Sequence, residues 1–134
     1  MKPDLLSLKQ TLIDKLTDDS RILAAYLHGS YVSGNPRPDS DVDCALLLYP
    51  GQPVLSGLEL MQLAGELSAV TGREIDLGLL EFSKLIYFVE AVSQGERILC
   101  REENLADALV SRAYSYYAQL REDRKVVEEA YHAA

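Results

Sequence analysis

Residues 22–30 read ILAAYLHGS, and residues 41–49 read DVDCALLLY after a gap of ten positions. The first run is apolar, too short for a typical helix and closed by Gly29, so it predicts a buried strand followed by a tight turn. Backbone N–H groups at such a turn attract anions, and the Ser30 hydroxyl would add a donor for a phosphate. Taken alone, a glycine and a serine after a strand more often mark an ordinary turn.

The second run predicts a strand that opens with Asp41 and Asp43 and ends at Pro50. Strand side chains alternate, so both carboxylates point the same way. Neighbouring carboxylates raise each other's pKa unless a cation lies between them, and oxygen ligands in low number suit Mg²⁺. A solvated acidic strand start would explain Asp39, but it explains the other two poorly because their strand is otherwise apolar.

A third acid, Asp76, lies in the run REIDLGLL at residues 73–80, which predicts another strand. Asp76 and Gly78 share one face of this strand, and Ile75, Leu77 and Leu79 share the other. A lone acid on a strand is more often a salt-bridge partner than a catalyst. Together with the Asp-x-Asp strand, however, three carboxylates can hold two Mg²⁺ ions about 3.5–4 Å apart, the arrangement for in-line displacement at phosphorus.

The combined motif resembles the DNA polymerase β-type nucleotidyltransferase superfamily, and the short length resembles its minimal nucleotidyltransferase (MNT) branch. The resemblance covers roughly residues 20–100. It implies an α/β (α+β) fold, with a small mixed β-sheet flanked by helices and the site at one edge. We expect residues 1–134 to form a single domain of this kind that ends in a long C-terminal helix.

The resemblance also implies roles for individual residues. Gly29 and Ser30 would hold the triphosphate of ATP, and Asp41 and Asp43 would bind both metal ions. Asp76 would bind the catalytic metal and help to deprotonate the attacking hydroxyl.

Three residues of the loop complete the expected nucleotide-binding set: Gly34, Arg37 and Ser40. Relatives often carry a small residue and an arginine before the second glycine. This chain has Tyr31-Val32-Ser33 there instead. We therefore expect Arg37 to supply the missing positive charge from the loop.

Stand-alone MNT proteins of this size are similar to antitoxins paired with a HEPN-domain ribonuclease toxin. The reaction implied is transfer of AMP from ATP to a tyrosine of that toxin. Enzymes of the superfamily that act on small molecules or tRNA usually carry a further domain for the acceptor, and this chain has only its last helix to spare. Two alternatives stay open, namely an antitoxin that only binds its partner and a nucleotidyltransferase that modifies a small molecule.

Composition narrows the possible partners. The formal net charge is −8, and no Lys/Arg cluster interrupts the excess of acids. This charge argues against tight nucleic-acid binding and suits a basic protein partner. Two cysteines, Cys44 and Cys100, are too few for a disulfide framework and are expected to be buried in strands. No signal peptide or membrane-spanning stretch is evident, so the expected location is the cytoplasm.

The remaining elements follow from apolar spacing. We expect helices at residues 5–16, 58–70 and from Ser83, as N-cap, to 94, a strand at 97–100 and a long helix at 104–131. On the long helix, the residues expected to share one apolar face are Leu105, Leu109, Ala113, Tyr116, Leu120 and Val127. The other tyrosines of this helix would either cover its flanks or face a partner. His28 is expected to pack in or near the core.

Overall fold

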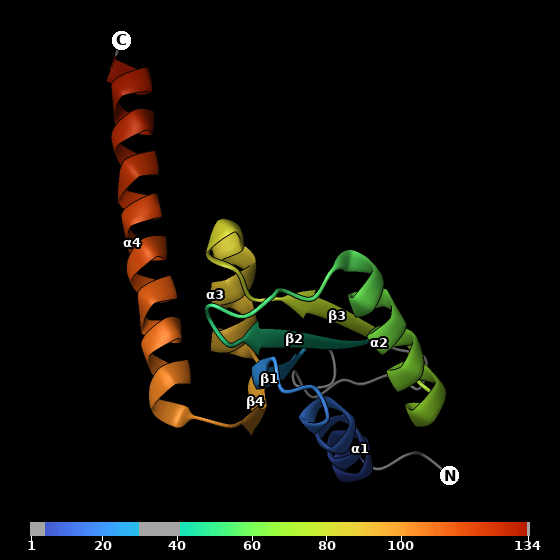
Figure 1. Cartoon of the computed structure of the whole chain (residues 1–134). Helices are drawn as coiled ribbons and strands as arrows, with labels where there is room; N and C mark the ends of the chain where they lie inside the picture. Colours follow the sequence, from blue (N-terminus) through green and yellow to red (C-terminus); the bar gives the residue numbers. More distant parts are fainter. Residues whose placement is uncertain (1–4, 30–40, 134) are drawn as a thin grey trace.

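The computed structural model describes residues 5–29 and 41–133. Within them, four strands form one mixed sheet in the order β3-β2-β1-β4 (Figure 1). β1 is antiparallel to β2 and β4, whereas β2 and β3 are parallel. The elements are α1 (Leu5–Thr17), β1 (Ile22–His28), β2 (Val42–Leu48), α2 (Gly57–Thr71), β3 (Ile75–Leu79), the 3-10 turn η1 (Phe82–Lys84), α3 (Leu85–Gln94), β4 (Glu96–Cys100) and α4 (Glu103–Ala133). The predicted fold class is confirmed.

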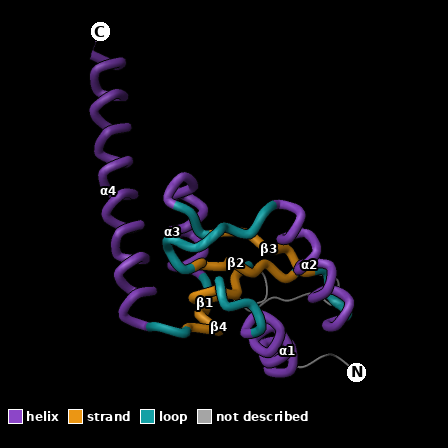
Figure 2. The backbone as a smooth tube through the Cα atoms, in the orientation of Figure 1, coloured by secondary structure: helices purple, strands orange, loops and turns teal. Residues whose placement is uncertain are grey.

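Helices cover both faces of the sheet (Figures 1 and 2). Leucines of α1 and α2, such as Leu12 and Leu67, pack on one face. Phe88 of α3 and Leu109 of α4 pack on the other face. Strands that are covered on both faces have no side that faces solvent. This is why β1 and most of β2 are unbroken apolar runs.

The predicted helix boundaries hold at α2 but not at the start of α3. α2 begins with a capping box between Ser56 and Glu59 and ends at Gly72, which has a φ of 69°. The prediction that Ser83 caps α3 is wrong. Ser83 lies within η1, where the Lys84 N–H bonds to the Glu81 carbonyl at 3.0 Å, so α3 begins only at Leu85, without a side-chain cap.

The first half of α4 packs against α3, and its second half projects past the rest of the molecule (Figure 1). The buried stripe runs through Ala106, Leu109 and Ala113. Contrary to expectation, Tyr116 is 48% exposed and Val127 is 67% exposed. Half-buried Tyr117 takes the place of Tyr116, and the stripe continues to Leu120, which is half-buried as predicted. Every described side chain beyond Leu120 is exposed because α4 outruns α3.

Arg97 of β4 joins the base of α4 to the sheet. Its guanidinium donates to the Tyr26 hydroxyl of β1 at 2.9 and 2.7 Å and pairs with Asp107 of α4 at 2.9 Å. Cys44 is buried as predicted, whereas Cys100 at the end of β4 is only half-buried. Among the described helices, none has the length and apolar character that crossing a bilayer requires.

Candidate active site

Three polar side chains form a row across three adjacent strands, at one end of the sheet. His28 ends β1 and lies in register with Asp43 of β2, and Asp43 lies in register with Asp76 of β3. The antiparallel pairing puts the end of β1 beside the start of β2, and the parallel pairing puts the starts of β2 and β3 together. Two acids that are far apart in the sequence therefore become neighbours.

Asp43 sits in surroundings that oppose its negative charge. Burial raises the pKa of this half-buried carboxyl, and Asp76 and Asp41 raise it further, while His28 lowers it. Asp41 and Asp76 are both exposed. A cation at this edge would relieve the repulsion among the three carboxylates.

Gly29 closes the row on the β1 side. Its φ of +87° lies in the region that favours glycine. A Cβ atom built on it would come 2.5 Å from the Asp43 Oδ2 atom. Any side chain here would therefore strain the backbone and push against the carboxylate, so the turn and the acid fit together only with glycine.

The row opens into a pocket of about 350 Å³. Its other walls come from residues 77–79 of β3 and from Lys84 and Tyr87. The Tyr87 hydroxyl lies 3.4 Å from the His28 Nε2 atom, and the two rings meet edge to face with centroids 5.8 Å apart. Burial raises the pKa of Tyr87 to about 12, and Cys44, Asp43 and Asp76 also contribute.

Gly78 makes room for this tyrosine. A Cβ atom on Gly78 would overlap the Tyr87 hydroxyl. The sequence analysis missed Tyr87 and Lys84 as parts of the site. The available signal was Gly78 itself, because a glycine inside an apolar strand often marks the close approach of another group.

The structure brings together four of the polar or turn residues considered from the sequence, namely Gly29, His28, Asp43 and Asp76, with Asp41 immediately before β2. The other predicted nucleotide-binding residues, Ser30, Gly34, Arg37 and Ser40, lie outside the described residues.

The described side chains at this site can be compared with the ligands that a metal ion needs. In the described part of the chain, no three His, Cys, Asp or Glu side chains converge as a ready metal centre. Asp43 and Asp76 nevertheless offer hard oxygen donors on adjacent strands. Mg²⁺ commonly takes one or two carboxylates and completes its shell with phosphate oxygens and water. The donor set therefore fits Mg²⁺ that arrives with a nucleotide.

The family of the chain is known from its sequence. A model of the family "Polymerase beta, Nucleotidyltransferase" matches residues 10–104. The chain belongs to this nucleotidyltransferase family. No curated protein matches the sequence.

Solved structures resemble the whole chain. A toxin–antitoxin complex with AMP-PNP contains a chain that is 22% identical, with a TM-score of 0.78 over 92% of this chain and 98% of the other. A complex of the tri-AMPylated Shewanella oneidensis HEPN toxin with its MNT antitoxin gives 21% identity and a TM-score of 0.73, over 93% and 96%. The MntA–HepT toxin–antitoxin gives 20% and 0.73, over 93% and 97%. These similarities confirm the polymerase β-like fold.

Proposed function

We propose that this chain transfers AMP from ATP to a hydroxyl of a partner protein, a tyrosine of a cognate HEPN ribonuclease toxin, and so acts as an antitoxin. The observation that carries the proposal is the pairing of Asp43 with Asp76, with Gly29 pressed against Asp43 at the same edge. Membership in the nucleotidyltransferase family supports the reaction class. The AMPylated toxin held by a structurally similar antitoxin supports the acceptor.

The glycine turn would bind the phosphates. At such a turn, backbone N–H groups and the Ser30 hydroxyl would donate to the phosphate oxygens. Gly34, Arg37 and Ser40 would complete the phosphate contacts from the loop. Lys84 lines the pocket of the carboxylates and contributes positive charge there.

The carboxylates would organise the reacting groups. Asp41, Asp43 and Asp76 would hold Mg²⁺, which supplies positive charge to offset the charge that develops on the phosphates. Asp76 is exposed, so it can be reached by an acceptor from outside, and it would accept the proton of the attacking hydroxyl. The acceptor oxygen bonds to the α-phosphorus, the bond from that phosphorus to the bridging oxygen breaks, and pyrophosphate leaves.

His28 and Tyr87 would keep the floor of the pocket in one arrangement. Tyr87 is half-buried, and its hydroxyl is hydrogen-bonded to His28, which lies beside Asp43. Fixed neighbours hold a catalytic carboxylate in the orientation that the reaction needs, and orientation supplies much of the rate in phosphoryl and nucleotidyl transfer.

Radiolabelled ATP tests the proposal. The chain, its cognate HEPN-domain partner and Mg²⁺ are incubated with ATP labelled at the α- or the γ-phosphate. The proposal predicts α-label on the partner and no γ-label. Label from the γ-phosphate would indicate a kinase instead, and α-label only in the small-molecule fraction would indicate a small-molecule acceptor. If neither label is transferred, while Asp43→Asn still inhibits the partner, the chain is an antitoxin that acts by binding alone.

A further inference from the structure

Three hollows on the α3–α4 side of the molecule adjoin one another. The first is the carboxylate pocket. The second, of about 430 Å³, lies over η1 and the start of α3 and shares Lys84 and Tyr87 with the first. The third, of about 670 Å³, lies between α3 and the outer part of α4 and shares Ile86, Leu120 and Arg124 with the second. Because shared side chains bound each successive pair, the hollows form one path, the α4 groove.

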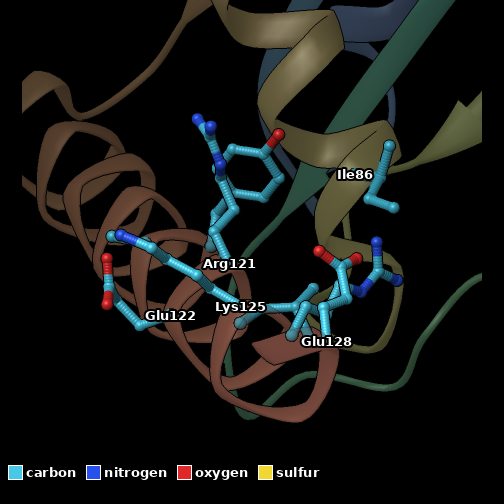
Figure 3. A pocket seen from close by; sticks show the side chains of 9 residues that line it. Ile86, Arg121, Glu122, Lys125 and Glu128 are labelled. Atoms are coloured by element: carbon cyan, nitrogen blue, oxygen red, sulfur yellow. The ribbon is translucent and has the colours of Figure 1, made fainter. Parts of the chain in front are cut away.

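The floor of the α4 groove is apolar and open. Phe82 of η1 is 36% exposed and Ile86 of α3 is 44% exposed. Figure 3 shows Ile86 and the charged side chains of α4 around the outermost hollow. Beyond it, Val127 and Tyr131 of α4 are 67% and 80% exposed. Apolar side chains that gather in a groove mark a contact surface more often than scattered ones do.

The two outer hollows of the α4 groove carry a charge opposite to that of the chain. Together they are lined by four basic residues, Lys84, Arg121, Arg124 and Lys125, and by two acids, Glu122 and Glu128. The whole chain has a formal net charge of −8. A surface that reverses the overall charge of its protein favours a ligand of complementary sign.

We infer that the α4 groove docks the protein that carries the acceptor hydroxyl, through a segment of that protein with apolar side chains and net negative charge. The inference rests on the proposed function for the identity of the acceptor. The path starts at Asp76 and ends on the projecting half of α4, so a segment that lies along it presents one of its hydroxyls at the carboxylates. A small acceptor would fill the inner pocket and need none of the outer surface.

Partner affinity in the absence of ATP tests the inference without catalysis. The full-length chain is titrated with the purified cognate HEPN-domain protein by calorimetry. The groove variants are Ile86→Asp, in the floor, and Arg124→Glu, in the wall. The matched controls make the same changes on the other layer, at exposed positions of α2 and α1: Leu58→Asp and Lys15→Glu. Thermal melting of each variant shows that it is folded.

The inference predicts that both groove variants bind the partner at least about tenfold more weakly, as expected for residues inside an interface, while the controls stay within about twofold. Wild-type affinity in both groove variants would overturn it, as would the absence of any binding by the wild type. Sedimentation of the chain alone adds a further outcome. A self-dimer that only the groove variants dissociate, with partner affinity unchanged, would assign the groove to a second copy and also overturn it.

Failure of the proposed function looks different. Groove-dependent binding without AMP transfer would leave the docking site standing and remove the enzymatic role. If both groove variants transfer AMP at the wild-type rate and bind the partner with wild-type affinity, the enzymatic role is supported and the docking site is refuted.

Discussion

Gly29 and Asp43 touch across the antiparallel β1–β2 pair so closely that a Cβ atom on the glycine would come 2.5 Å from the Asp43 Oδ2 atom. The predicted anion-binding turn and the acidic strand are separate motifs in the sequence. The contact makes them one site, because a shift of either element moves the other. Phosphate binding and carboxylate placement are therefore expected to fail together.

Gly29→Ala tests this contact. The positive φ makes the substitution costly by about 1–3 kcal/mol in the free energy of unfolding. Displacement of Asp43 should also lower the rate of AMP transfer by about 100-fold. Urea unfolding and single-turnover transfer measure the two effects. Gly65→Ala in α2, where an added Cβ atom meets open space, is the control and should stabilise the chain by about 0.5–1 kcal/mol. Wild-type transfer by Gly29→Ala would refute the coupling.

Asp43→Asn should abolish transfer without loss of stability. Burial raises the pKa of Asp43 above its unfolded value, so the folded state holds more protons between the two values. The free energy of unfolding then falls as pH rises through that window, and the ionised carboxylate costs stability at neutral pH. The variant should melt at the same or a higher temperature than the wild type at pH 7. That advantage should fade as pH falls through this window and be lost below 3.8, the ordinary value for this carboxyl.

Asp107→Asn is the contrasting control for this experiment. Its carboxylate pairs with Arg97 at 2.9 Å instead of facing other acids. Asp107 is exposed, so we expect a loss of about 0–1 kcal/mol at neutral pH and no gain. A clear drop in the melting temperature of Asp43→Asn, larger than that of Asp107→Asn, would count against the carboxylate repulsion described above.

Gly78 and Tyr87 should be energetically coupled. A methyl group at Gly78 overlaps the Tyr87 hydroxyl, so Gly78→Ala should cost about 1–3 kcal/mol in an otherwise wild-type chain. In a Tyr87→Ala background the same change should cost little, because the phenol is gone. Chemical denaturation of the two single variants and the double variant gives the coupling energy. Additive costs would show that Tyr87 does not rest on Gly78.

Arg97→Met should loosen the attachment of α4. The change removes the two hydrogen bonds to the nearly fully buried Tyr26 and the ion pair with Asp107, but keeps an apolar stem. Loss of a charged donor to a buried hydroxyl costs about 1–3 kcal/mol in unfolding free energy. Arg112→Met, whose guanidinium lies 5.8 Å from the Phe82 ring centroid, should cost about 0.5–1 kcal/mol. Unfolding in guanidinium chloride measures both variants. Equal losses of unfolding free energy in Arg97→Met and Arg112→Met would contradict the anchoring role of Arg97.

The sheet can be predicted from the sequence because its central strands are buried on both faces, so that β1 and most of β2 are apolar runs. The predicted helix at 58–70 lies within one residue of α2 at each end, where the capping box at Ser56 and the turn at Gly72 set its limits. The start of α3 cannot be predicted, since a tight turn takes up the residues before Leu85. The exposed side of α4 cannot either, because it depends on where α3 stops supporting a 31-residue helix.

The carboxylates of the candidate site can be predicted, because an acid within an otherwise apolar strand is unfavourable unless it is paired or binds a cation. Asp43 and Asp76 become neighbours because β2 and β3 pair in parallel with these two residues in register. Tyr87 cannot be found in this way. It belongs to an apolar helix pattern, and only the packing of α3 on the sheet brings its hydroxyl over Gly78 and beside His28.

Intact-mass spectrometry of the cognate HEPN-domain partner, after incubation with this chain, ATP and Mg²⁺, tests the central claim most directly. The account predicts one or more added AMP groups on a tyrosine of the partner with the wild-type chain and none with Asp43→Asn. An unmodified partner in the wild-type reaction, or equal modification by Asp43→Asn, would contradict it.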